Sequence, residues 1–112
     1  MVPLNKDALK AIRSRDRYRK RYCKDSQWVF ADESGERVKT VYPAFWETLE
    51  LSGIEDFRIH DLRHTFASWL VMRGVSLYVV RDLLGHSSIK MTERYAHLAQ
   101  SALVQAVAVL DD

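Results

Sequence analysis

The sequence contains little cysteine, proline or glycine: one Cys, two Pro and four Gly among 112 residues. A single cysteine, Cys23, excludes an internal disulfide and a cysteine-rich zinc site, and it favours a reducing compartment such as the cytoplasm. There is no run of about 18 apolar residues, so we expect no membrane-spanning helix and no membrane partner. The N-terminal residues MVPLNKDALK also lack the apolar core of a secretion signal. The chain is about as long as one domain, and its hydrophobic fraction of 47% is enough for a globular core.

Positive charge is concentrated at the start of the chain, although the formal net charge is only +2. Residues 1–25 hold nine Lys or Arg against three Asp or Glu, whereas residues 26–57 hold two against seven. A basic block of this kind favours an anionic polymer such as DNA, because Lys and Arg contact phosphates and position a protein on them. The candidates for such contacts are Arg13, Arg17, Lys20 and Arg21. The alternative is a solvated, basic helix face.

The order of apolar and turn residues predicts a mostly α-helical fold with a small β element (α+β). Helices are expected over 7–22 after Asn5 or Asp7, over 43–52, over 60–73, over 77–84 after Ser76, and over 89–98 after Ser87 or Ser88. The apolar run 27–30 before a turn at Gly35 predicts a strand or small hairpin, and residues 1–4 resemble the end of a strand.

Two of the expected helices carry large apolar surfaces. In the helix over 60–73, Leu62, Phe66, Trp69 and Leu70 recur at helical spacing and form the predicted buried stripe. The tail over 99–110, AQSALVQAVAVL, has no charged residue and predicts a helix that must be buried. It either packs back in cis to close the core of its own domain or docks in trans into another molecule.

A few polar residues have spacings that suit chemistry. His60 and Arg63 stand three apart, so they share a helix face on which both can donate hydrogen bonds to a phosphate. His86 follows Gly85 at a helix-ending turn, and Tyr95 lies nine residues further on. Each of these has an ordinary structural alternative, such as a surface ion pair or a packed aromatic ring. His60 and His64 have a spacing that suits zinc, but no Glu lies between them as in a metalloprotease motif, so we expect no metal or other cofactor.

Taken together, three motifs carry more information than their single residues. They are HDLRHTFAS at 60–68, LLGHSSI at 83–89 and TERYAH at 92–97. Their order and spacing resemble the C-terminal catalytic region of the tyrosine recombinases, the phage-integrase and Xer-like family, and the resemblance runs from about residue 2 to residue 98. It implies DNA integration or excision, as in phages and mobile elements, by cleavage and rejoining of double-stranded DNA without ATP or metal.

The resemblance also assigns roles. Tyr95 matches the nucleophile that forms a 3′-phosphotyrosyl intermediate and releases a 5′-hydroxyl. His60 and Arg63 match the His-x-x-Arg motif, and His86 matches the second histidine position. His60 is then a candidate acceptor for the tyrosine proton. Lys90 and Arg94 flank Tyr95 and are candidates for contacts to the DNA backbone.

The resemblance further implies that residues 1–112 form a single partial catalytic domain. The first catalytic Arg, a hairpin Lys and the DNA-clamping domain of the family correspond to positions before residue 1, so we expect the isolated fragment to be inactive. The tail over 99–112 is expected to dock in cis, or in trans on another protomer of a tetramer on DNA. The alternatives are a non-catalytic DNA-binding module, a type IB topoisomerase-like enzyme that nicks and relaxes DNA, and a zinc-binding fold.

Overall fold

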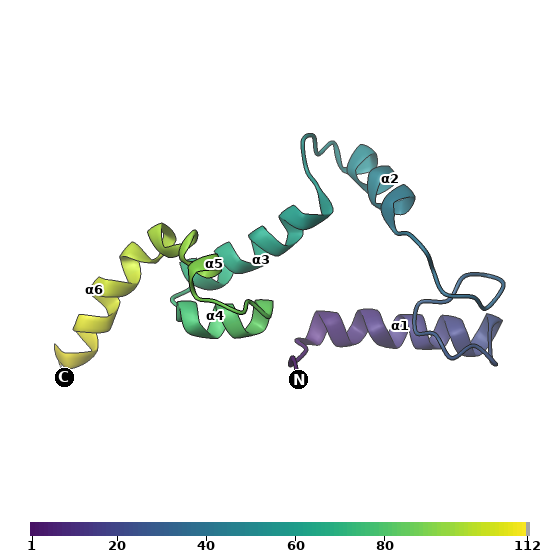
Figure 1. The fold of residues 1–112 in the computed structure, drawn as a ribbon, viewed down its shortest axis with the longest axis horizontal. Helices are drawn as coiled ribbons and strands as arrows, with labels where there is room; N and C mark the ends of the chain where they lie inside the picture. The colour runs from purple at the N-terminus through teal and green to yellow at the C-terminus, as the bar shows by residue number, and fades with distance from the viewer. Residues whose placement is uncertain (112) are drawn as a thin grey trace. The chain divides into compact units, whose positions relative to one another are not determined.

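The computed structural model describes residues 1–111, and the side chains of all of these except residues 100–102. It contains six α-helices and two short 3-10 helices (Figure 1). They are α1 (Lys6–Tyr22), α2 (Tyr42–Ser52), α3 (Ile59–Met72), α4 (Leu77–Leu84), α5 (Lys90–Glu93), η1 (Ala96–Ala99), α6 (Gln100–Ala108) and η2 (Val109–Asp111). The predicted mostly helical fold is therefore confirmed. None of the helices in residues 1–111 is long and apolar enough to cross a bilayer.

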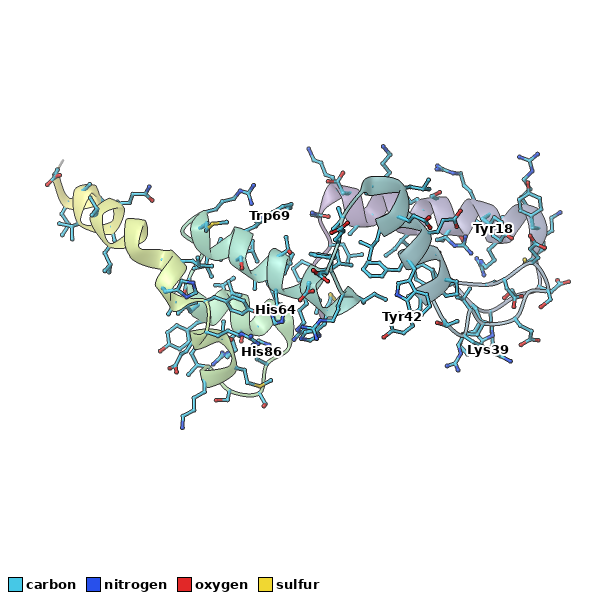
Figure 2. The ribbon with its side chains drawn as sticks, turned by 90° about the horizontal axis from the view of Figure 1, so that it is seen from above. Tyr18, Lys39, Tyr42, His64, Trp69 and His86 are labelled. Carbon is cyan, nitrogen blue, oxygen red and sulfur yellow. The ribbon has the colours of Figure 1, made fainter. Side chains whose placement is uncertain are left out.

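The chain divides into two compact units, residues 1–53 and the part from Ile54 onward. In the first unit, Asn5 begins α1, because its side-chain oxygen accepts a hydrogen bond from the Ala8 amide at 2.9 Å. Arg15 of α1 donates to the Ala31 carbonyl at 2.7 Å, which holds the loop that follows the helix. Cys23 and Ala31 are buried there. Figure 2 labels Tyr18 on α1 and, further along the chain, Lys39 and Tyr42.

The small β element of the prediction is not found. In the part of the chain that the structure describes there is no strand, and the β pairing is one antiparallel bridge between Ala31 and Arg37. Gly35, with φ at +84°, makes the turn between them, as expected. The apolar side chains of 28–30 are exposed, so no buried face holds them in a sheet, and a strand without partners or a buried face is unstable. Residues 1–4 likewise form no strand.

Glycine and serine set the ends of two helices as the sequence predicted. Pro43 lies in the first turn of α2, and Gly53 ends this helix with φ at +63°. The hydroxyl of Ser76 accepts a hydrogen bond from the Tyr78 amide at 3.3 Å at the start of α4. Gly85 ends α4 with φ at +67° and turns the chain toward α5.

The core of the second unit lies where α3 packs on α4 and η1. Ala67 and Val71 of α3, Val80 and Leu84 of α4, and Tyr95 form its buried cluster. A small side chain such as alanine lets a neighbouring helix approach closely. The stripe of α3 that faces α4 is therefore built on Ala67 and Val71.

The predicted buried stripe of α3 is wrong for its three large members. Leu62, Phe66 and Trp69 are 54%, 44% and 56% exposed, while Leu70 packs partly against the core. Their helical periodicity is real, but it marks a second apolar face of α3. Hydrophobicity alone does not tell which of two apolar faces a partner helix covers.

The continuous helix predicted over 89–98 is also wrong, because the segment consists of α5 and η1 with a turn between them. The Tyr95 amide donates to the Thr92 carbonyl at 3.0 Å, and the Leu98 amide donates to the Tyr95 carbonyl at 3.0 Å. Such bonds tighten the chain to about three residues per turn, which stacks side chains three apart. Thr92 and Tyr95 are buried, and Leu98 packs on the same core. The tightened turns therefore point Tyr95 inward.

The tail is helical as predicted, but its described side chains are not buried. Leu103, Val104, Val107, Val109 and Leu110 are between 66% and 83% exposed. Leu98 and Ala99, which precede these residues in the chain, pack on the core of the second unit. Residues 103–111 lie beyond that core, which leaves an apolar helical surface uncovered in the described part of the chain.

Candidate functional site

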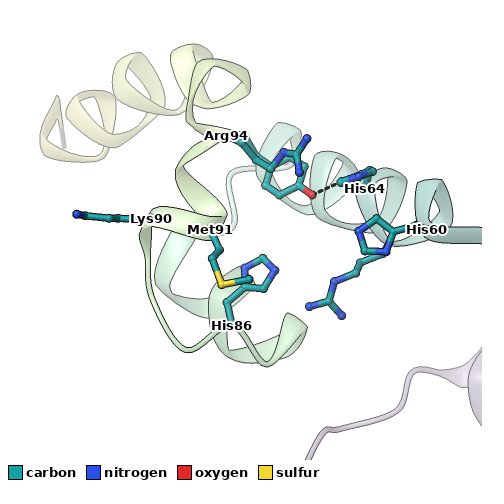
Figure 3. Close-up of a pocket in the computed structure, with 8 residues that line it drawn as sticks. His60, His64, His86, Lys90, Met91 and Arg94 are labelled. Atoms are coloured by element: carbon teal, nitrogen blue, oxygen red, sulfur yellow. Dashed lines mark hydrogen bonds between the residues drawn. The ribbon is translucent and has the colours of Figure 1, made fainter.

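A pocket of about 730 Å³ lies in the second unit. Its lining comes from α3, from the turn after α4, from α5 and from the two residues between α5 and η1. The lining residues are His60, Arg63, His64, His86, Lys90, Met91, Arg94 and Tyr95 (Figure 3). Six of them are the residues that the sequence singled out around the three motifs. The chemistry of the lining is that of imidazoles, cationic groups and one phenol.

Arg63 stands on α3, and its guanidinium donates a hydrogen bond to the Leu84 carbonyl at the end of α4. This bond ties α3 to α4 and fixes the orientation of the planar group. An arginine has five N–H donors in a rigid fork, so the remaining donors are available to a ligand in the pocket. A fixed cation of this kind suits a phosphate or a carboxylate.

His86 is held by the turn at Gly85 and by Thr92. Its backbone amide donates to the Arg81 carbonyl at 3.0 Å, and its Nδ1 lies 2.8 Å from the hydroxyl of Thr92, which is fully buried. This contact leaves Nε2 as the ring nitrogen available to a ligand. Burial lowers the pKa of His86, and the nearby charges of Arg63 and Arg94 lower it further.

Tyr95 makes its hydrogen bond with His64, a residue for which the sequence predicted no part in the chemistry on DNA. The Nδ1 atom of His64 lies 2.6 Å from the Tyr95 hydroxyl, as the dashed line in Figure 3 shows. Figure 2 labels His64 on α3 and His86 beyond α4. Burial lowers the pKa of His64, and the positive charge of Arg94 adds to the effect.

His60 lies one helical turn before His64 on α3. The two imidazole rings meet edge to face, with their centroids 4.8 Å apart and their planes at 84°. His60 is exposed toward the pocket. Within residues 1–111, the hydrogen bond recorded for the Tyr95 hydroxyl is the one with His64.

Lys90 and Arg94 add positive charge to the pocket. Both are exposed, and the Arg94 guanidinium lies 5.7 Å from the centroid of the Tyr95 ring. The pocket therefore combines two exposed cations with the half-buried Arg63. Such a charge distribution attracts anions.

The four basic candidates of the first unit share one face of α1, because Arg13, Arg17, Lys20 and Arg21 follow helical spacing. All four are exposed, and Lys20 forms an ion pair with Asp16 at 2.7 Å. These four residues belong to the first unit, whereas all residues that line the pocket belong to the second.

His60 and His64, whose spacing suits a metal, both line the pocket. In the described part of the chain, no group of three or more His, Cys, Asp or Glu side chains lies close enough together to hold a metal ion. His64 also directs its Nδ1 to Tyr95. The structure thus lends no support to the zinc-binding alternative.

Comparison with known proteins identifies the family of the chain. The model of the phage integrase family matches residues 1–102. The integrase of Salmonella phage P22 is 50% identical over 68 residues, which are 61% of this chain and 18% of that protein. The tyrosine recombinase XerC of Corynebacterium glutamicum is 32% identical over 108 residues, 95% of this chain and 35% of the relative.

The tyrosine recombinase XerD of Rhizobium meliloti is 35% identical over 108 residues, 92% of this chain and 35% of the relative. The chain thus spans between 18% and 35% of the length of these three curated relatives. No solved structure matches the chain. Since the family model covers residues 1–102 and the three motifs gather around one pocket, the chain belongs to the phage integrase family of tyrosine recombinases.

Proposed function

We propose that the chain is part of the catalytic domain of a site-specific recombinase that cleaves and rejoins double-stranded DNA. The observation that carries this proposal is the meeting of Tyr95 with His60, Arg63 and His86 around one cationic pocket. Membership of the phage integrase family supports the same activity. The DNA substrate and the single free cysteine fit action in the cytoplasm.

In this function the Tyr95 oxygen attacks a DNA phosphorus and forms a 3′-phosphotyrosyl bond, while the 5′-oxygen leaves. The transition state gathers negative charge on the non-bridging oxygens of the phosphate. Arg63, with His60 and His86 beside it, donates hydrogen bonds there. Losing one fixed donor of this kind costs about 100–1000-fold in rate. A 5′-hydroxyl from a partner strand then attacks the phosphotyrosyl bond and restores the DNA chain.

Contacts to the DNA backbone come from exposed basic residues in both units. Lys90 and Arg94 border the pocket, so they contact phosphates near the cut. On α1 the corresponding contacts are made by Arg13, Arg17, Lys20 and Arg21. Phosphate contacts position the protein on the duplex and do not read its sequence.

We expect the isolated chain to be inactive on ordinary DNA. The family resemblance assigns a further arginine and a lysine, which protonates the leaving 5′-oxygen, to positions before residue 1. When several residues that act together in one transition state are missing, the rate falls, but the separate losses do not add up. A substrate whose leaving group departs without an acid makes the lysine unnecessary.

We also propose that the apolar tail docks in trans on a neighbouring protomer assembled on DNA. The support is the exposure of the tail between Leu103 and Leu110. Burying such a surface yields about 25 cal/mol per Å². An uncovered helix of this kind therefore gains stability from a partner surface.

The experiment that tests the catalytic function is a covalent trap. The chain is incubated with a pool of DNA duplexes that carry one 5′-bridging phosphorothiolate within randomised flanking sequence. A sulfur leaving group departs without a general acid, so the trap does not depend on the lysine. The Tyr95→Phe variant is the matched control, because it removes only the attacking hydroxyl. Covalent protein–DNA product is detected as a band that survives denaturing electrophoresis.

We expect such a band from the wild-type chain and none from Tyr95→Phe. DNA binding without any covalent band would contradict catalysis and favour the non-catalytic binding module. Relaxation of supercoiled plasmid without strand exchange would favour the topoisomerase-like alternative.

A further inference from the structure

We propose that His64 is the proton acceptor for Tyr95, with Nδ1 taking the phenolic proton as the tyrosine oxygen bonds to phosphorus. This inference rests on the proposed function, and it assigns a step of that function to a residue to which the family resemblance gave no role. In the step, an Oη–P bond forms and the P–O5′ bond breaks. The phenolic proton moves to His64, and the leaving oxygen takes a proton from water or from a general acid. In the rejoining step the imidazolium returns its proton to the tyrosine oxygen.

Distance is the first support. A general base must lie within about 2.6–3.2 Å of the atom that gives up the proton. The Nδ1 of His64 lies 2.6 Å from Oη of Tyr95 before any ligand is present. His60, which has the family's His-x-x-Arg position, stands one turn away and is exposed toward the pocket, where it is free to bind phosphate oxygens.

The surroundings of His64 favour its neutral form, which is the form that accepts a proton. Burial lowers the pKa of this imidazole, Arg94, His60 and Arg58 lower it further, and Asp61 acts in the opposite direction. The groups that face His64 come from α3, from the residue just before it and from the segment after α5. They are Arg58, His60, Asp61, Arg94 and Tyr95. At neutral pH the imidazole is therefore ready to accept.

The rigidity of both partners is the third support. His64 is held on α3 and contacts the His60 ring edge to face. Tyr95 is only 6% exposed, because its ring belongs to the core with Ala67 and Val71. A base and a nucleophile that are held at bonding distance need little reorganisation when the substrate arrives. The Arg94 cation near the ring attracts the negative charge that develops on the oxygen.

The test compares variants of His64 in the phosphorothiolate trap. His64→Asn keeps an acceptor near the position of Nδ1, because its amide oxygen can still hold the phenol, but it cannot take a proton. His64→Ala removes both the hydrogen bond and the base. His97→Asn is the matched control, since His97 is exposed and does not line the pocket. Losing a general base costs about 100–10,000-fold in rate.

We expect His64→Asn to be as slow as His64→Ala, and His97→Asn to match the wild-type chain. The wild-type rate should rise with pH and level off once His64 is neutral, whereas the His64→Asn rate should keep rising as hydroxide replaces the base. A His64→Asn rate close to wild type would overturn the role of His64 as base. A wild-type chain that forms no covalent product would overturn the proposed function instead.

A measurement without DNA decides the direction of the hydrogen bond. Nitrogen NMR of the imidazole rings shows which ring nitrogen of His64 carries the proton, and the His64→Asn spectrum assigns the signals. An unprotonated Nδ1 whose shift changes in Tyr95→Phe supports the proposal. A proton on Nδ1 would overturn it, because the ring would then donate to the phenol.

Discussion

Replacing Thr92 by valine separates the orientation of His86 from the packing around it. Thr92 is fully buried, and its hydroxyl bonds to Nδ1 of His86 at 2.8 Å. Valine keeps the size and branching of threonine but exchanges the hydroxyl for a methyl group. The Thr92→Val variant therefore leaves His86 in the pocket without the bond that fixes its ring.

The expected magnitudes follow from these contacts. An unsatisfied buried partner costs about 1–3 kcal/mol, and His86 is half-buried, so water replaces part of the bond and the cost stays near the lower figure. The covalent step should slow about tenfold, which is about 1.4 kcal/mol of transition-state stabilisation. This loss is smaller than that of deleting a donor, because the imidazole is still present.

Thr92→Ser is the matched control, since it keeps the hydroxyl and loses one methyl group. That methyl is worth about 0.8 kcal/mol of burial, so both variants should lose similar stability. Stability is measured by urea unfolding followed through the NMR signals of α3 and α4, and rate by the phosphorothiolate trap. We expect the serine variant to react at nearly the wild-type rate. A serine variant as slow as the valine variant would show that packing, and not orientation of His86, sets the rate.

Two further predictions concern pH and the tail. Because the pKa values of His64 and His86 are lowered in the folded state, the unfolded chain binds more protons below about pH 6.5. The free energy of unfolding of the second unit should therefore fall as pH drops below that value. His86→Asn should make this dependence on pH less steep. An equally steep dependence in the variant, measured by amide hydrogen exchange, would refute the prediction. In the tail, Leu103→Asp with Val107→Asp should abolish self-association on DNA in sedimentation, while Gln105→Glu should not. Association that survives the double variant would contradict docking in trans.

The helices were predictable to within one or two residues wherever caps and glycines mark their ends. Asn5, Gly53, Ser76 and Gly85 all act as the sequence indicated. The predicted β element was wrong because an apolar run forms a strand only where it has neighbouring strands and a buried face. In the described structure residues 28–30 have neither. The predicted burial of Leu62, Phe66 and Trp69 was wrong because α3 has two apolar faces and α4 packs on the other one.

In the candidate site, the sequence motifs identified four residues that line one pocket: His60, Arg63, His86 and Tyr95. Their catalytic roles remain predictions. The contact between His64 and Tyr95 could not be predicted from the motifs, because it depends on the backbone geometry around Tyr95. Over 89–98 the periodicity predicts an α-helix, in which residues three apart lie about 60° apart around the axis. The observed turns bring Thr92 and Tyr95 into line on the buried side.

The same turns have a consequence for the chemistry. Tyr95 is both a core residue and the proposed nucleophile, so its hydroxyl cannot travel far without opening the cluster that includes Val71 and Leu84. A buried aromatic ring contributes several kcal/mol to a core, roughly 3–5 when it is removed. In the proposed function the DNA phosphate therefore comes to the tyrosine, and we expect the exposed cations at the rim, Lys90 and Arg94, to bring it there. On this proposal the packed residues fix the nucleophile and its base, while the exposed residues determine where the substrate binds.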